Sequence, residues 1–573
     1  MLSFDFDFLF FMTTKQEISR RRTFAIVSHP DAGKTTLTEK LLLYGGAVHL
    51  AGSVTARKKE RATVSDWMEL ERKRGISVSS TVLNFDYDGY RVNLLDTPGH
   101  KDFSEDTYRV LTAVDSVIMV VDGGKGIENQ TRKLFEVCRR RNTPVFTFVN
   151  KMDRPALDTL ALLDEIEQVL KIGAYPMNLP LGSGADFKGV LDRGTGLAHF
   201  YERTPGGAYR AAVETHGGLS DPVVKDTLSP SVYNTLCEEM EMVEHAGVSF
   251  SPDDVLAGKT TPVFFGSAAN NFGVQQLLDG FLKYSPPPLP RINARKGIIG
   301  GNIADNVDSN NTNDGDIDDN NINTADSANA ALIDPTTEIF SGFVFKIQAN
   351  MDPKHRDRMA FIRIVSGKFT RNMAATLIRT GKPLRLANSS NVFGRERTTV
   401  DEAYAGDVIG VMGTDALNIG DTLSEDTGIM YDEIPSFPPE CFAYIHNPSP
   451  ANYKRFREGL TQLVQEGLVK LFEIPSGHQR ISLLGAVGPL QFDLVQYRLE
   501  AEYGAASRIE HTDWTMVKRI RNESGEPISE SSMHIPMGAQ LALDKNDCQV
   551  LLFPSDWHLQ FFKEHNKNIV LID

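Results

Sequence analysis

The feature that most constrains this chain is a strand–loop–helix pattern near its start. The apolar run Thr23–Ser28 has the length of a strand, HPDAGKTT follows it, and LTEKLLLYG continues with helical periodicity. This order places a Gly-Lys-Thr segment at a helix N-terminus, where backbone N–H groups and the helix dipole favour an anion. The candidate phosphate-binding residues are Ser28, His29, Pro30, Asp31, Ala32, Gly33, Lys34, Thr35 and Thr36.

Two side chains of this loop suit a nucleotide. Lys34 can reach the outer phosphates, and the Thr35 hydroxyl can ligate Mg2+. Ser28 stands where the strict pattern has Gly. An ordinary glycine-containing turn is therefore the alternative interpretation of this motif alone.

A second motif favours the nucleotide interpretation. Two strand-like runs, Thr81–Tyr87 and Arg91–Leu95, are joined by an Asp-Gly turn. The second run leads into Asp96, Thr97, Pro98, Gly99 and His100. A carboxylate at such a strand end is well placed to meet a nucleotide-bound Mg2+, often through water, and the backbone N–H of Gly99 can approach a terminal phosphate. A turn without chemistry is the alternative.

Further apolar runs predict the fold of this region. Ser116–Asp122, Pro144–Asp153 and Thr261–Ala268 contain unbroken apolar stretches, as expected for strands covered on both faces of a parallel sheet. Helical segments are predicted at Phe103–Ala113, Glu128–Arg141 and Pro155–Lys171. The pattern predicts a doubly wound α/β domain with its ligand at the carboxyl ends of the strands.

The segment Asn150, Lys151, Met152, Asp153 follows one of these strands and predicts a guanine site. The Asp153 carboxylate can accept the adjacent N1–H and 2-amino group of guanine. The Asn150 amide can donate to the base, and the Lys151 stem can lie along its ring. Adenine would leave the carboxylate unpaired, a mismatch that can reject a ligand by roughly 10^4-fold. Ser267 and Ala268, with Gly266, can offer backbone N–H groups to the guanine carbonyl. A surface Asn-Lys pair in a loop is the alternative.

Composition limits the class of protein. The 60 Lys and Arg against 75 Asp and Glu give a net charge of −15, but seven Asp lie in 301–330, so the rest of the chain gives no argument about nucleic acid. No apolar run reaches the ~20 residues of a membrane helix. Four separated cysteines predict a reducing, cytoplasmic setting and neither a zinc site nor disulfides.

The chain is predicted to divide into several parts. Residues 1–19 form an N-terminal extension, and translation could begin at Met12. Residues 20–290 form the first domain. The Asn/Asp-rich stretch within 291–335 predicts a disordered linker, without the spacing of a calcium loop. Strand-like runs with Gly-rich turns predict a β-barrel at 336–430, and strand–strand–helix alternation predicts an α+β domain at 431–573. Asn150 and Ser267 lie 117 positions apart, which predicts a subdomain inserted at 172–258.

These motifs resemble the GTP-binding proteins of translation. SHPDAGKTT, RGIS (Arg74–Ser77), DTPGH, NKMD and GSA occur in that family's order. The His of DTPGH is typical of the ribosome-dependent branch. With its insert and only two later modules, the chain is similar to the bacterial peptide chain release factor three family. The similarity runs from about Arg20 to the C-terminus and includes GFVFKIQANMDPKHRDRMAFIRIVSGK and GAVGPLQFD.

The resemblance implies a monomeric GTPase that binds GTP or GDP with Mg2+ and is stimulated by the ribosome. It implies that the protein removes class I, stop-codon-reading release factors after peptide release, without a membrane or DNA partner. Ser77 would join Thr35 and Asp96 at Mg2+, and His100 would orient the attacking water beside Gly99 and Lys34. A translocase or ribosome-protection GTPase, or a regulator whose nucleotide only sets conformation, are the alternatives. Basic residues of the last domain could contact ribosomal RNA or simply be solvated.

Overall fold

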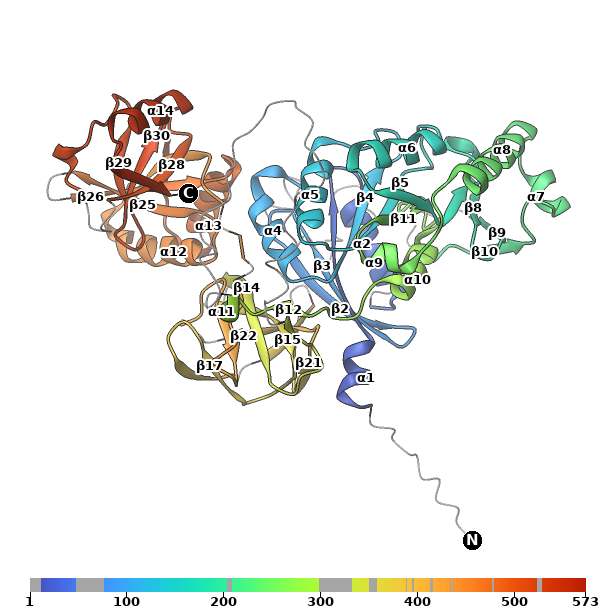
Figure 1. Cartoon of the computed structure of the whole chain (residues 1–573), viewed down its shortest axis with the longest axis horizontal. Coiled ribbons are helices and arrows are strands. Elements are labelled where there is room, and N and C mark those ends of the chain that lie inside the picture. Colours follow the sequence, from blue (N-terminus) through green and yellow to red (C-terminus); the bar gives the residue numbers. More distant parts are fainter. Residues whose placement is uncertain are drawn as a thin grey trace, which may run out of the picture.

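The computed structural model describes residues 12–47, 77–202, 209–297, 332–349, 358–387, 389–393, 396–412, 416–432, 434–435, 437–476, 479–522 and 528–572. The expectations for 1–11, for Arg74–Ile76 and for most of the Asn/Asp-rich linker lie outside these residues. The multidomain α/β prediction is confirmed: an α/β domain with an insert, a β domain and an α+β domain follow one another along the chain (Figure 1). The insert and the last domain lie at opposite ends of the long axis (Figure 1).

A seven-stranded sheet in the order β2-β3-β1-β4-β5-β11-β6 forms the first domain. Its strands are β1 (Arg21–Ser28), β2 (Thr81–Tyr87), β3 (Tyr90–Asp96), β4 (Ser116–Asp122), β5 (Val145–Asn150), β6 (Gly173–Pro176) and β11 (Thr260–Phe265). β2 pairs antiparallel with β3, and the other pairings are parallel. The central strands are buried along their whole length, which explains their unbroken apolar runs.

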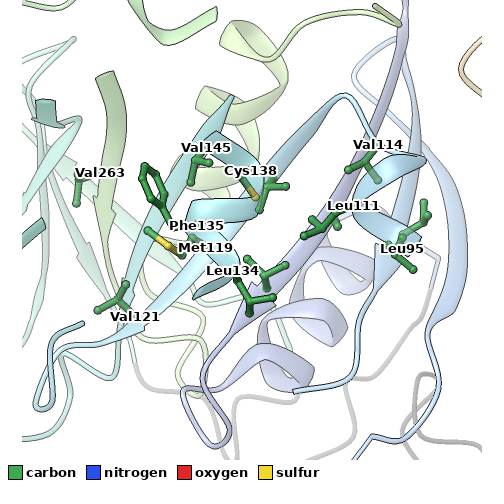
Figure 2. Close-up of a cluster of buried hydrophobic side chains, with 14 of the residues drawn as sticks. Leu95, Leu111, Val114, Met119, Val121, Leu134, Phe135, Cys138, Val145 and Val263 are labelled. Atoms are coloured by element: carbon green, nitrogen blue, oxygen red, sulfur yellow. The ribbon is translucent and has the colours of Figure 1, made fainter. Parts of the chain in front are cut away.

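Helices cover both faces of this sheet. The helices are α2 (Lys34–Tyr44), α4 (Ser104–Thr112), α5 (Asn129–Arg140), α6 (Thr159–Leu170) and α10 (Val274–Tyr284). α2 and α10 pack on one face, while α4, α5 and α6 pack on the other. Figure 2 shows part of the apolar core on the face that α4, α5 and α6 cover. Leu134, Phe135 and Cys138 of α5 pack there onto the strands. The third predicted helix begins later than expected, because Asp158 caps it by accepting from the Leu160 and Ala161 N–H groups.

The inserted subdomain begins after β6, later than the predicted start at Ile172. β6 pairs with β11 in the main sheet, with Gly173 opposite Thr260, and therefore belongs to the first domain. The insert contains a sheet in the order β10-β9-β8-β7. Its elements are β7 (Asn178–Pro180), η2 (Gly184–Asp186), β8 (Gly189–Asp192), β9 (Ala198–Tyr201), β10 (Val213–His216), α7 (Pro222–Thr227), α8 (Pro230–Ala246) and α9 (Pro252–Leu256).

The predicted N-terminal extension and the ends of the predicted disordered linker both contain secondary structure. Within the predicted extension, α1 (Thr14–Ser19) has a capping box between Thr13 and Gln16 and a buried Ile18. At the ends of the predicted linker, β12 (Arg291–Ile292) pairs with β13 (Leu332–Ile333), and α11 (Ala294–Gly297) follows β12. The apolar flanks pair although the Asn/Asp-rich composition between them predicts disorder.

The β domain contains an eight-stranded sheet in the order β18-β17-β23-β14-β15-β22-β19-β20 and a small β16-β21 pair. The longest strands are β14 (Ser341–Ala349) and β15 (Arg358–Ser366). The others are β16 (Lys368–Thr370), β17 (Ala374–Leu377), β18 (Lys382–Arg385), β19 (Ser389–Phe393), β20 (Glu396–Thr399), β21 (Glu402–Tyr404), β22 (Val408–Met412) and β23 (Thr422–Ser424). The expected β architecture is therefore present.

The last domain has an antiparallel sheet in the order β27-β24-β26-β25-β29-β30-β28-β31. Its elements are β24 (Cys441–His446), η6 (Pro450–Asn452), α12 (Tyr453–Gln465), β25 (Lys470–Ser476), β26 (Gln479–Ala486), α13 (Leu490–Tyr503), β27 (Arg508–His511), β28 (Met516–Asn522), η7 (Glu530–Ser532), β29 (Gln540–Asp544), β30 (Gln549–Phe553), α14 (Asp556–His565) and β31 (Ile569–Ile572). The predicted strand–strand–helix order corresponds to β25, β26 and α13.

Candidate nucleotide site

The predicted phosphate loop lies between β1 and α2. Gly33 caps α2 with a φ of 102°, and a Cβ there would lie 2.2 Å from the Asn150 amide nitrogen. Only glycine fits this position, because both the backbone conformation and the space exclude a side chain. Thr35 and Thr36 follow in the first turn of α2, half-buried. The residues from Ser28 to Thr36 thus form the turn that the sequence predicted.

Lys34 and Asp96 meet at the centre of the site. The Lys34 ammonium lies 2.7 Å from Asp96 Oδ1, and the two side chains are 5% and 3% exposed. The Thr38 hydroxyl, one turn along α2 from Lys34, donates to the same oxygen at 3.0 Å. Sequence reasoning missed Thr38, although its spacing of four from Lys34 places both on one side of the helix. The contact joins the phosphate loop to the end of β3.

The segment after β3 is held by threonine hydroxyl groups that donate to backbone carbonyls. The Thr97 hydroxyl donates to the Ile26 carbonyl of β1 at 2.7 Å, and the Thr107 hydroxyl donates to the Pro98 carbonyl at 3.1 Å. A Cβ on Gly99 would lie 3.7 Å from the Pro30 Cα, so this segment runs beside the phosphate loop. The structure therefore brings together the two phosphate motifs that lie far apart in the sequence.

Asn150 makes two contacts within the protein that the sequence did not predict. Its amide nitrogen donates to the Ala32 carbonyl at 2.8 Å, and its Oδ1 accepts from the Ala268 N–H at 2.9 Å. The side chain therefore joins the phosphate loop to the loop after β11, and only the second N–H of its amide remains for a base.

The N–H groups of Gly266, Ser267 and Ala268 also have protein partners. They donate to the Val149 carbonyl, the Phe272 carbonyl and Asn150 Oδ1 respectively. The prediction treated these groups as available to the guanine carbonyl. A base could reach the Ala268 N–H only by sharing it with Asn150.

Lys151 joins the predicted phosphate loop to the end of β4. Its ammonium donates to the Asp31 carbonyl at 2.6 Å and pairs with Asp122 Oδ2 at 2.7 Å. Burial alone would raise the pKa of Asp122, but hydrogen bonds from Lys151 and the Gly124 N–H hold that pKa below its ordinary value. Sequence analysis named Asp122 only as the end of a predicted strand. That strand pairs with β5, with Asp122 opposite Asn150, so the shared sheet edge is the signal that could have placed Asp122 in the site.

Asp153, the residue predicted to recognise guanine, has a buried carboxylate oxygen. Its Oδ1 is buried and makes no hydrogen bond within the protein. Such a group is costly to bury unless a ligand or water supplies a donor. Met152, beside it, is buried with 1% exposure and donates its N–H to the Gly266 carbonyl. Asp153 therefore follows a residue that is anchored to the loop after β11, and its Oδ1 can accept a hydrogen bond.

His100 lies at the other side of the site. Its ring is about one-third exposed, and Nδ1 accepts from the Asp102 N–H at 3.3 Å. Ser77, the first described residue of its segment, is half-buried and precedes the buried Val78. Val78 packs with Phe103, so the Ser77 segment contacts the turn that follows His100.

A protein-only metal site is absent from the described ranges: no group of three His, Cys, Asp or Glu side chains there could hold an ion. Thr35 and Asp96 are the oxygen donors that fit Mg2+, and Mg2+ commonly takes one or two protein ligands together with substrate phosphates. In the part of the chain that the structure describes, no helix is long and apolar enough to cross a membrane.

Three family models match consecutive parts of the chain. The elongation factor Tu GTP binding domain matches residues 19–287, elongation factor G domain 2 matches 339–426, and the class II release factor RF3 C-terminal domain matches 431–563. Together they follow the order of domains along the chain.

Full-length relatives carry one name. Peptide chain release factor 3 of Gloeobacter violaceus is 47% identical over 97% of this chain and 98% of its own length. The Synechocystis protein of the same name is 47% identical over 95% of this chain and 93% of its own. A crystal structure of a Thermus thermophilus protein has a TM-score of 0.64 at 22% identity and covers 91% of this chain and 73% of that one, which shows likeness of fold.

Proposed function

This chain belongs to the peptide chain release factor 3 family, and from that membership we propose how its residues bind and hydrolyse GTP. It is a translational GTPase that acts with the ribosome in termination and promotes recycling of the stop-codon-reading release factors. The proposal concerns the role of each residue, the metal and the finer choice of partner. We propose that it acts as a monomer, with class I release factors as its functional partners.

The phosphates of GTP bind at the N-terminus of α2. The backbone N–H groups from Asp31 to Thr35 and the Lys34 ammonium provide the positive charge. Lys34 then exchanges its contact with Asp96 for phosphate oxygens. The positive φ of Gly33 and its close packing against the Asn150 side chain, which shape the turn before α2, support this placement.

Thr35, Ser77 and Asp96 would hold Mg2+, with Asp96 acting through water. The ion, when bound, neutralises charge on the phosphates of the substrate. When Lys34 turns to the phosphates, Asp96 Oδ1 keeps the Thr38 hydroxyl and can accept from a water molecule on the ion in place of Lys34. Phosphoryl transfer needs mainly positioning and charge stabilisation, which these side chains supply.

His100 and Gly99 act on the terminal phosphate. The Gly99 N–H contacts a phosphate oxygen, and the His100 ring orients the attacking water once the ribosome places it. Because His100 Nδ1 accepts from the Asp102 N–H, Nε2 is the ring nitrogen left to donate toward the water or a phosphate oxygen.

The single observation that carries guanine binding is the buried Asp153 oxygen without a protein partner. Multiple-turnover hydrolysis of GTP and of ATP, with and without ribosomes, tests the proposal. We expect rapid turnover with GTP and ribosomes together and little with ATP. Equal rates with and without ribosomes would contradict it and favour a regulator whose nucleotide only sets conformation.

A further inference from the structure

Asp102 contacts the proposed water-orienting histidine from two directions. It lies in the short helix η1 (Lys101–Phe103) and is 2% exposed. Its backbone N–H donates to His100 Nδ1 at 3.3 Å, and its Oδ1 lies 3.4 Å from the same nitrogen. The backbone N–H and the carboxylate oxygen both face Nδ1, so two groups of one residue set the direction in which this ring nitrogen points. Asp102 therefore limits how the His100 ring can turn.

The other oxygen of Asp102 belongs to a contact with the last domain. Its Oδ2 accepts from the N–H of Leu490, the first residue of α13, at 3.0 Å. The preceding turn is pressed against the same carboxylate, since a Cβ on Gly488 would lie 2.2 Å from Asp102 Cγ. The Asp102 carboxylate thus contacts both His100 and Leu490 of the last domain, which lies 388 residues later in the chain.

Neighbouring contacts hold α13 in this place. Val78, Phe103 and Leu494 of α13 form a small apolar cluster beside Asp102. On α4, Arg109 donates to the Gly467 carbonyl at 3.1 Å. Docking of the last domain therefore buries Asp102 and excludes the water that would otherwise solvate its carboxylate.

We propose that Asp102 is a positioning residue for GTP hydrolysis, which holds His100 in its working orientation while α13 of the last domain holds Asp102. The inference rests on the proposed role of His100. When α13 leaves, the Asp102 side chain gains rotational freedom and water, and the His100 ring loses its fixed partner. The position of the last domain thereby sets the rate of hydrolysis without contact between that domain and the nucleotide.

The test separates the contact from the histidine itself. Gly488→Ala lies in the last domain, has no positive-φ strain to confound it, and places a methyl group against Asp102. Asp102→Ala removes the carboxylate, and Asp102→Asn keeps an oxygen that accepts from Leu490. Gly217→Ala in the insert is the matched control, because the nearest atom to its Cβ lies at 3.4 Å. His100→Ala reports the histidine's own role.

Single-turnover hydrolysis on saturating ribosomes and GTP affinity are measured for each folded variant. Misplacing a catalytic group by about 1 Å can cost roughly 10^2-fold, so we expect Asp102→Ala and Gly488→Ala each to slow hydrolysis by at least ~10-fold. GTP affinity should stay within about twofold. Asp102→Asn should retain most of the rate, and the double variant should be no slower than the slower single, because both break one contact. Should Gly488→Ala fail to fold, the comparison of Asp102→Ala with Asp102→Asn still decides.

The contrary outcomes point to different errors. Wild-type rates in Asp102→Ala and Gly488→Ala beside a slow His100→Ala would overturn positioning by Asp102 and leave the proposed function intact. A slow Asp102→Ala with a fully active, folded Gly488→Ala would overturn the link to the last domain. A fully active His100→Ala would overturn the proposed role of His100 and this inference together.

Discussion

At the scale of single residues, Asp153 is the side chain whose exchange should change which base is bound. Asp153→Asn is expected to favour xanthine nucleotides over GTP, because an amide NH2 can meet the carbonyl that xanthine has in place of the 2-amino group. A mismatched buried hydrogen bond costs about 1–3 kcal/mol, which corresponds to roughly 10- to 100-fold in affinity. Titrations with GDP and xanthosine diphosphate measure it, with the exposed Asp186→Asn as the control. Unchanged GDP preference would remove Asp153 from the base site.

The sequence predicts where a candidate site residue lies in the fold better than it predicts the hydrogen-bond partners of that residue. The positions of the predicted phosphate loop, Asp96 and Asp153 could be placed in the fold because each lies at or just after a strand end in a local pattern. The partners of Asn150 could not, since Ala32 and Ala268 lie 118 residues from it on either side and only the folded sheet brings them together. Asp102 was missed for the same reason, because its partner Leu490 lies in another domain.

At the scale of elements, the contact between α8 and α6 should respond to pH. Glu239 of α8 is 7% exposed, and burial raises the pKa of its carboxyl to about 7, despite a hydrogen bond from Thr159. Because the folded pKa lies above the unfolded one, the folded state holds the proton longer. Stability contributed by the neutral carboxyl is therefore full below about pH 4.5 and declines as pH rises toward about 7.

Glu239→Gln removes this titration while keeping the size of the side chain. We expect the variant to be more stable than the wild type at pH 8 by about 1–2 kcal/mol and nearly equal to it at pH 5. Thermal unfolding at the two pH values measures the difference, and Glu244→Gln on an exposed part of the same helix is the control. A gap between Glu239→Gln and the wild type that is the same at both pH values would contradict a raised pKa.

Long periodic elements were predictable and short or edge elements were not. The unbroken strands of the first sheet and the amphipathic helices α5 and α12 have clear sequence signals. β6 is only four residues long, and the prediction assigned it to the insert. Its pairing with β11 depends on residues far away in the sequence and appears only in the folded sheet. α1 was missed although its capping box from Thr13 to Gln16 is a local signal.

At the scale of the whole molecule, buried charges join the three domains. Arg363 of the β domain pairs with Asp115 of the first domain at 2.5 Å, with both side chains almost fully buried. Glu466 of the last domain accepts from the Ala349 N–H of the β domain at 2.8 Å and pairs with the buried Arg498. Its backbone carbonyl also accepts from Arg109 of α4. Breaking a buried pair commonly costs about 3–5 kcal/mol, so these contacts favour one relative placement of the domains.

The Asn/Asp-rich stretch between the first two domains should be dispensable. Replacing 302–331 with a short Gly/Ser linker is expected to leave the melting temperature and the ribosome-stimulated GTPase rate unchanged. The pairing of Ile292 with Leu332 brings its two flanks together, so a short linker can span them. Closure entropy also changes slowly with loop length, by about 0.6 kcal/mol per doubling. A melting temperature lower by several degrees would show that the stretch packs against the protein.

The joined domains also make a prediction about the ribosome. With GTP, this protein should accelerate the departure of a bound stop-codon-reading release factor from ribosomes after peptide release. A nucleotide can drive departure only when the GTP form binds a state of the ribosome that disfavours the resident factor. In this chain the segments at Ser79 and Ser80 and at Asp102 contact the β domain and the last domain, through Lys346 and Leu490. A change at the terminal phosphate can therefore alter the placement of both later domains.

Dissociation of a fluorescently labelled release factor, followed with GTP, with GDP and without this protein, measures the effect. Because a switch acts through its differential affinity for two states, a GTP-dependent acceleration of at least ~10-fold requires a difference of about 1.4 kcal/mol between them. Gly488→Ala, which disturbs the contact at Asp102, should reduce the acceleration, whereas Gly217→Ala should not. An unchanged dissociation rate together with faster movement of tRNA and messenger would instead indicate a translocase. Ribosome binding without either effect would indicate a regulator.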